Sequence, residues 1–149
     1  TAMRRSEGTA LAALLSGQID RIASLTEAAR VETATRAISQ AQALRDSLAR
    51  ILAATEAVDA TRLAQELALL AVKTDITEAI DRLTAHVEAA RAHLADPEPV
   101  GRKLDFLMQE FMREANTLCS KAQSLALTRI GLDLKTVIDQ MREQVQNVE

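Results

Sequence analysis

The chain has 149 residues, a net charge of −3 and 1% aromatic residues, with neither Trp nor Tyr. Its single cysteine excludes an internal disulfide framework, and the charge balance excludes the bulk basic surplus of many nucleic-acid binders. No stretch approaches the roughly 18 consecutive apolar residues of a membrane span. We therefore expect a cytoplasmic protein with no membrane partner.

Glycine and proline are both absent between Gly17 and Pro97, while Ala, Leu, Glu, Arg and Gln are abundant. Such a stretch offers few turn signals and favours helix over strand. The sequence therefore predicts an all-α protein, with long amphipathic helices forming an elongated helical hairpin or bundle.

The first region, residues 1–58, is predicted to form a long helical arm or hairpin. We favour one long helix, because no breaker separates its two apolar sets. These sets are Leu11, Leu15, Ile19, Ile22, Leu25 and Ala29, followed by Ala34, Ile38, Ala41, Leu44, Leu48 and Ile51.

The second region, residues 59–149, is predicted to form a helical domain. Asp59 is a candidate N-cap for its first helix. Residues 67–72 (LALLAV) are apolar almost all round, so we expect them to be deeply buried. Asp75 and Glu78 fit a capping box, so the helix either restarts at Asp75 or passes there into a different packing environment.

Pro97 and Pro99 mark the clearest break in the chain, because helices normally stop before such a connector. A helix then begins near residue 100 or 101, and a last amphipathic helix runs through residues 127–148. The short connectors predict antiparallel neighbours.

The helix after the prolines has two unlike faces. Its apolar face contains Leu104, Leu107, Met108, Phe111, Met112, Ala115, Leu118 and Ala122. Both phenylalanines lie in this helix, where we expect them to act as aromatic anchors. A narrow polar stripe at the edge of the apolar face contains Lys103, Glu110, Glu114, Thr117 and Lys121. A helix that only packs would not need this stripe.

Two polar constellations could carry chemistry. The first is Asp75, Glu78, Arg82 and His86, which share one helical edge at spacings of i, i+3, i+7 and i+11. Carboxylates one turn apart can share a divalent cation, and a histidine can move a proton near neutral pH. The structural alternative is a cap, an ordinary i,i+4 ion pair and an exposed histidine.

The second constellation lies on the helix after the prolines. Glu110 and Glu114 could hold Mg²⁺ or Mn²⁺, while Lys103, Arg113 and Lys121 could hold phosphates. The alternative is a bundle helix with solvated ion pairs. Together the two constellations are compatible with metal-assisted phosphodiester cleavage. No Walker, Rossmann, HExxH or CxxC motif is present, so we expect no small-molecule cofactor.

The segment GRKLDFLMQEFMREANTLCSKA (101–122) resembles the C-terminal domain of the YicC family of bacterial endoribonucleases. LAQELALLAVKTDITEAIDRLTAH (63–86) and MREQVQNVE (141–149) resemble it as well, so the match is specific over 59–149 and looser before it. The resemblance implies a cytoplasmic, metal-dependent endoribonuclease that works on RNA as a homo-oligomer and has a further N-terminal domain. The isolated fragment could therefore be inactive.

Three positions depart from the family pattern. Val72 stands where an acidic residue is usual, Met112 where Asn is usual, and Cys119 where Gly is usual. If the position of Met112 touches RNA or metal, the departure would alter activity or selectivity. Replacing Gly by Cys119 removes a flexible point.

From the chemistry of the matching positions we assign three groups of site residues. The catalytic candidates are Glu78, His86, Glu110 and Glu114, with His86 as the general acid or base. The metal ligands are Asp75, Glu110 and Glu114. The RNA contacts are Arg82, Arg102, Lys103, Gln109, Arg113, Asn116 and Lys121.

The alternative function is a helical oligomerisation or RNA-clamping module without its own catalytic activity. The two functions predict different structures. An enzyme needs the two polar edges to converge on one site, whereas a structural module needs only ion pairs within each helix surface.

Overall fold

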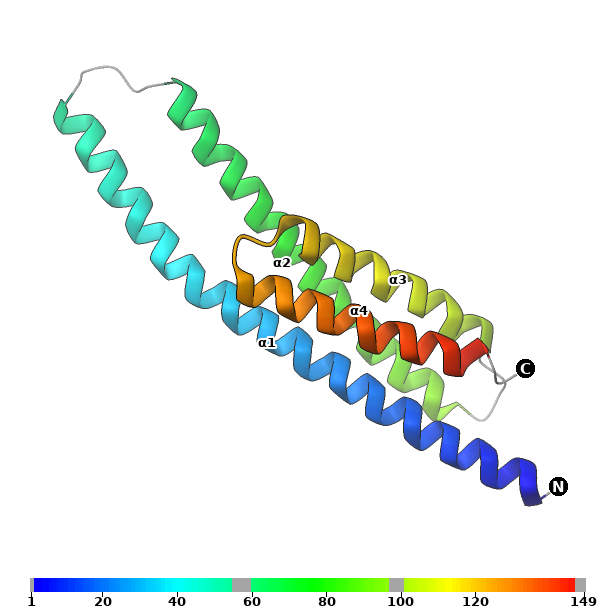
Figure 1. Cartoon of the computed structure of the whole chain (residues 1–149). Coiled ribbons are helices and arrows are strands. Elements are labelled where there is room, and N and C mark those ends of the chain that lie inside the picture. Colours follow the sequence, from blue (N-terminus) through cyan, green and yellow to red (C-terminus); the bar gives the residue numbers. More distant parts are fainter. Residues whose placement is uncertain (1, 55–59, 97–100, 147–149) are drawn as a thin grey trace.

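The computed structural model describes residues 2–54, 60–96 and 101–146, with side chains from residue 8 to 50, 60 to 96 and 101 to 146 (Figure 1). These residues form four α-helices: α1 (Ala2–Ala54), α2 (Ala60–Ala95), α3 (Gly101–Lys121) and α4 (Leu125–Gln146). No strand occurs in these ranges, which confirms the all-α prediction. The region 1–58 contributes one helix without interruption as far as Ala54, as the lack of a breaker predicted.

The helices form an up-and-down bundle in which each helix packs against two others. The packed pairs are α1 with α2, α2 with α3, α3 with α4, and α4 with α1. At 1.5 Å per residue, α1 is about 80 Å long and α4 about 33 Å long. The bundle therefore covers one end of α1 and α2, and the other end extends beyond it as a pair of helices (Figure 1). We call residues 34–54 and 60–72 the arm.

One core runs through all four helices and contains the predicted apolar stripes. Ile19 and Ile22 of α1, Leu83 of α2, Phe111 of α3 and Ile138 of α4 are fully buried. The first apolar set of α1 therefore faces the core, as its spacing predicted. The second set does not: among the described residues between Ala29 and Ile76, none is buried.

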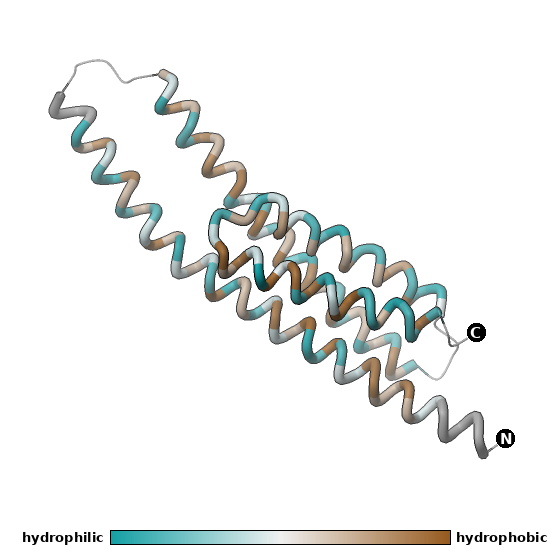
Figure 2. The backbone as a smooth tube through the Cα atoms, viewed as in Figure 1, coloured by the Kyte–Doolittle hydropathy of each residue, from teal (hydrophilic) through white to brown (hydrophobic). Residues whose placement is uncertain are grey.

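The predicted burial of residues 67–72 is wrong. Leu67, Leu69 and Leu70 are 58%, 50% and 48% exposed. The reason is that α3 and α4 are too short to cover the arm, where apolar residues remain along the tube in Figure 2. The helix also does not restart at Asp75, because α2 runs without interruption from Ala60 to Ala95. The second alternative is correct: α2 enters the bundle there, with Ile76 as its first buried residue. The predicted cap at Asp59 lies outside the described residues.

The connection between α3 and α4 is fixed to α1 by polar contacts. The Arg36 guanidinium donates a hydrogen bond of 2.8 Å to the carbonyl oxygen of Gln123. The Gln40 side-chain amide donates another of 2.8 Å to the Gln123 side chain. Ser124 caps α4, since its hydroxyl oxygen accepts the backbone N–H of Leu127 at 3.0 Å. These contacts hold the α3–α4 connection against α1 at the start of α4.

A groove of about 230 Å³ lies between the two helices of the arm, lined by residues that include Leu44, Leu69 and Leu70. It is away from both predicted constellations. Across the described parts of the chain, no helix is both long and apolar enough to cross a membrane.

Candidate active site

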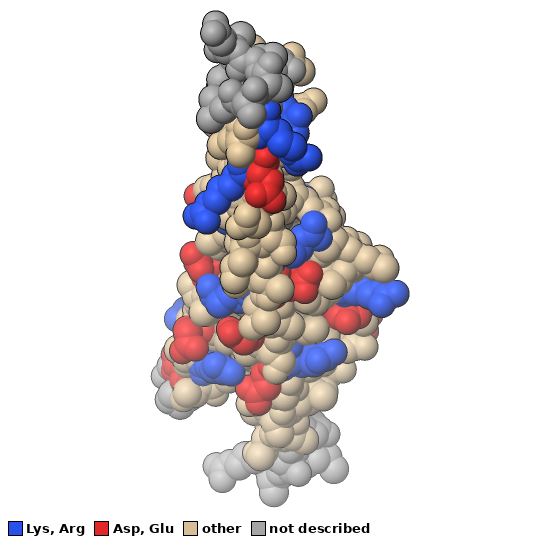
Figure 3. Space-filling model, turned by 90° about the vertical axis from the view of Figure 1, so that its left-hand side faces the viewer, with Lys and Arg blue, Asp and Glu red and all other residues tan. Residues whose placement is uncertain are grey.

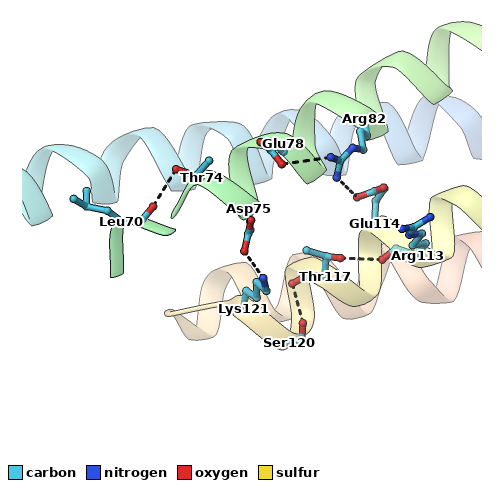
Figure 4. Close-up of polar contacts among 10 residues, drawn as sticks. All are labelled: Leu70, Thr74, Asp75, Glu78, Arg82, Arg113, Glu114, Thr117, Ser120 and Lys121. Atoms are coloured by element: carbon cyan, nitrogen blue, oxygen red, sulfur yellow. Dashed lines mark hydrogen bonds and ion pairs between the residues drawn. The ribbon is translucent and has the colours of Figure 1, made fainter. Parts of the chain in front are cut away.

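The antiparallel packing of α2 and α3 brings the two polar constellations together along one line. Three pairs join α2 to α3. Lys121 of α3 donates to the carboxylate of Asp75, and an Arg82 nitrogen lies 3.7 Å from a Glu114 oxygen (Figure 4). In the third pair, His86 Nε2 lies 3.9 Å from a Glu110 oxygen. From one pair to the next, the number of residues is the same on both antiparallel helices. We call these six residues, with Glu78, the seam.

The register follows from helix geometry. Moving from Asp75 to Arg82 advances seven residues on α2, and moving from Lys121 to Glu114 goes back seven on α3. The next step, to His86 and Glu110, is four residues on each helix. Steps of seven and four return to the same helical face, so every pair can meet across the contact.

Glu114 is the buried centre of the seam. It is 3% exposed and is the one ionisable residue that is buried in the described parts of the chain. Its nearest cation is Arg82, which is half exposed, and the 3.7 Å separation is too long for a hydrogen bond. Burial of a carboxylate is unfavourable unless a cation or hydrogen-bond donors compensate it. Among the described residues, Arg82 is therefore the one cation within 4 Å of the Glu114 carboxylate.

His86 is held between the core and the two glutamates. Its ring meets the buried ring of Phe111 edge to face, with centroids 6.0 Å apart and an interplanar angle of 87°. Such contacts fix ring orientation. The imidazole therefore has one side against the core, and its Nε2 faces Glu110.

One atom each from His86, Glu110 and Glu114 can lie within 4.8 Å of one another, which fits a divalent cation. Two carboxylates and an imidazole are a common donor set for transition metals. Glu110 and His86 are only partly buried, so the cluster keeps access to solvent.

Two of the predicted site residues lie away from this cluster. Asp75 pairs with Lys121 and is eleven residues, or about three turns, from His86 along α2. Glu78 lies 3.3 Å from Arg82 and is exposed (Figure 4). The geometry thus groups His86, rather than Asp75, with Glu110 and Glu114.

The other predicted RNA contacts are exposed on α3: Lys103 lies on the polar stripe with Glu110 and Glu114, and the rest lie on the outer side of the helix. Arg102, Lys103 and Arg113 are exposed, and none of them has an ion-pair partner among residues 8–50, 60–96 and 101–146. Gln109 and Asn116 are exposed beside them, and the Gln109 amide donates to Asp105 at 3.3 Å. Arg82 and Lys121 differ from this group, because carboxylates of the seam already hold them.

The face drawn in Figure 3 has no single dominant charge. On the face in Figure 3, acidic and basic side chains alternate. The feature that could hold phosphates is therefore the local set Arg102, Lys103 and Arg113, which has no ion-pair partner among the described residues.

Phe106 differs from its expected role as an anchor. It is 60% exposed, whereas Phe111 is fully buried. Its helical position predicts this result, because Phe106 falls with Arg102, Gln109 and Arg113 at spacings of i−4, i+3 and i+7, not on the apolar face.

The fold and the seam define a helical-bundle domain with a candidate cation cluster beside basic residues that no described carboxylate pairs with. Residues 28–149 match the family model described as endoribonuclease YicC-like, C-terminal, and the chain belongs to this family.

Two relatives carry the name "Probable endoribonuclease YicC". The one from Haemophilus influenzae is 42% identical over 148 residues, which is 99% of this chain and 50% of the relative. The one from Clostridioides difficile is 32% identical over 147 residues, again 99% and 50%. The chain thus spans about half the length of these relatives. The resemblance predicted from the sequence is confirmed.

Proposed function

We propose that this chain is the RNA-cleaving part of a metal-dependent endoribonuclease, with His86, Glu110 and Glu114 as the cation ligands. The observation that carries the proposal is the cluster itself, in which two helices bring three ligand groups within 4.8 Å. The names of the relatives, "Probable endoribonuclease YicC", support RNA as the substrate class.

Of the two predicted ions, we propose Mn²⁺ over Mg²⁺. Mg²⁺ prefers oxygen ligands and keeps several waters, whereas an imidazole nitrogen is a good ligand for transition metals. With His86 in the set, the cluster is better suited to the softer ion. His86 then acts as a ligand rather than as the general acid or base that we expected from its spacing.

A cation bound here would activate a water molecule and stabilise the charge that develops on the scissile phosphate. Side chains of α2 then contact the phosphate or position the residues that do. Arg82 touches Glu114 and is half exposed, so its guanidinium can also contact a phosphate. Glu78 contacts Arg82 from α2 at 3.3 Å and acts as a positioning residue for it. Asp75 does the same for Lys121.

Substrate binding is proposed for the outer side of α3 and for the adjoining polar stripe, which carries Lys103. Arg102, Lys103 and Arg113 carry positive charges that no described carboxylate neutralises, so they are free to pair with phosphates. Gln109 and Asn116 add polar groups on the same side. This side of α3 continues directly into the edge that carries Glu110 and Glu114.

A structural or RNA-clamping module remains the second candidate. The observation in its favour is that the seam residues pair with one another across α2 and α3, which would also join two helices in a protein without chemistry. Such a module would keep its RNA binding when Glu110 is changed to Gln but lose it when Lys103 is changed to Ala.

The test is RNA cleavage by the full-length protein with Mn²⁺ or Mg²⁺, with and without EDTA, for the parent and the Glu110→Gln/Glu114→Gln double variant. We expect chelator-sensitive cleavage, faster with Mn²⁺, that disappears in the double variant while RNA binding remains. The matched control is Glu88→Gln, because Glu88 is an exposed glutamate of α2 outside the seam.

A second readout is metal binding by the chain itself. A ligand that binds only the folded state stabilises it by about 2.7 kcal/mol at 100 times its Kd. Mn²⁺ should therefore raise the unfolding temperature of the parent and of Glu88→Gln, but not that of the double variant. If the double variant cuts RNA as well as the parent, the glutamates are structural and the proposed site is wrong.

We also propose that the protein works as a homo-oligomer. The exposed apolar side chains of the arm, including Ile38, Leu67 and Leu69, support this proposal. Exposed apolar patches of this kind mark interaction surfaces. Sedimentation of the chain at several concentrations would test it.

A further inference from the structure

Phe106 is an exposed aromatic ring in a chain that has almost none. The chain contains two phenylalanines and no Trp or Tyr, and Phe106 is 60% exposed. Burial of an aromatic side chain is a large favourable term in folding, and this ring forgoes most of it. The ring therefore contributes little to the core and is available to a ligand.

The neighbours of Phe106 on α3 are cations that have no ion-pair partner in the described parts of the chain. Arg102 and Lys103 lie one turn before it, and Arg113 lies two turns after it on the same helical stripe. All three are exposed, and the described residues provide no ion pair for any of them. An aromatic face between positive charges is complementary to a nucleic-acid strand, which offers a flat base and anionic phosphates.

Phe106 also lies next to the candidate cation cluster. Glu110 follows it by four residues, which is about one helical turn, or about 6 Å along the axis. A base stacked on Phe106 would therefore bring the adjoining backbone to the edge of α3 that carries Glu110 and Glu114. The ring would thus fix which phosphate reaches the cluster.

We propose that Phe106 stacks on an unpaired base of the RNA, while Arg102, Lys103 and Arg113 hold the flanking phosphates. The substrate class is then single-stranded RNA, because a base inside a duplex has both faces covered by its neighbours. This inference rests on the proposed function for its substrate, and it adds the residue that positions the strand.

The experiment compares RNA binding by the parent chain and by Phe106→Ala, Phe106→Leu and Phe106→Trp. The probes are a single-stranded RNA and a duplex containing the same sequence, measured by fluorescence anisotropy at several salt concentrations. Loss of one stacking contact should weaken single-strand binding roughly 5- to 150-fold. Phe106→Leu should be as weak as Phe106→Ala, Phe106→Trp should bind like the parent, and duplex binding should change little.

Two controls separate stacking from other roles. Leu132→Ala removes an exposed apolar side chain from α4, 52% exposed, and should leave RNA binding unchanged. Arg113→Ala should reduce the slope of binding against salt by about one, whereas Phe106→Ala should leave the slope unchanged. Because the chain contains no Trp, Phe106→Trp also provides a single indole whose fluorescence single-stranded RNA should quench.

Three results would overturn the inference. In the first, Phe106→Ala binds single-stranded RNA like the parent, or the parent binds none. In the second, Phe106→Leu restores binding, which would show an apolar contact without stacking. In the third, Phe106→Ala changes the sedimentation of the chain, which would assign the ring to a protein interface. If instead the full-length protein cuts no RNA but Phe106→Ala still weakens binding, the nuclease proposal fails and the stacking inference stands.

Discussion

Gly131 of α4 lies directly against Cys119 and Ala115 of α3, and its replacement by alanine gives a sharp test of the packing. A Cβ atom at Gly131 would lie 2.6 Å from Cys119 Sγ, 3.5 Å from the Cys119 nitrogen and 3.7 Å from the Ala115 carbonyl oxygen. Only the first of these distances is a clash. Overpacking of this kind costs about 1–3 kcal/mol, whereas Gly→Ala in a helix gains about 0.8–1.0 kcal/mol.

We therefore expect Gly131→Ala to lower the free energy of unfolding by about 1 kcal/mol. For a chain of this size that corresponds to a fall of about 2–4 °C in Tm. In a Cys119→Ala background the clashing sulfur is gone and the nearest remaining atom is at ordinary contact distance. There the same substitution should raise stability by up to about 1 kcal/mol, because only the helix-propensity gain remains.

The assay is urea and thermal unfolding of the parent, both single variants and the double variant, followed by far-ultraviolet circular dichroism under reducing conditions. The change of sign between the two backgrounds is the decisive result. The reasoning would be refuted if Gly131→Ala stabilised the parent, or if its effect were the same in both backgrounds to within about 0.5 kcal/mol.

Three further predictions concern the core, the seam and the arm. Phe111→Ala should lower the free energy of unfolding by about 3–5 kcal/mol in urea titrations, because the ring is fully buried; a loss below about 1 kcal/mol would contradict the packing. Arg82→Ala should destabilise the chain more than Arg91→Ala, because loss of Arg82 leaves the buried Glu114 carboxylate without a cation, whereas both carboxylates near Arg91 are exposed. Equal effects in thermal unfolding would contradict this prediction. Leu67→Ser should leave the bundle's unfolding free energy within about 0.5 kcal/mol but weaken self-association in sedimentation, and unchanged association would argue against the arm as the interface.

The sequence was sufficient for the helices and for much of the core. The absence of Gly and Pro between Gly17 and Pro97 predicts long helices, because nothing in that stretch breaks the hydrogen-bonded ladder. Helical spacing identified the buried stripe from Leu15 to Ala29. It also put the two polar constellations on single helical edges, which depends only on local geometry.

The tertiary structure decided which helix faces are buried and which residues of α2 and α3 meet. Residues 67–72 have the composition of a buried helix, yet 67–71 are exposed and Val72 is only partly buried, because α3 and α4 end before covering them. Burial is a property of neighbouring elements, and a single helix's pattern does not contain their lengths. In the same way, the α2–α3 register joined His86 to Glu110 and Glu114 and left Asp75 with Lys121. Spacing along one helix determines which residues share an edge. Only the packing of two helices determines which residues of one edge contact which residues of the other.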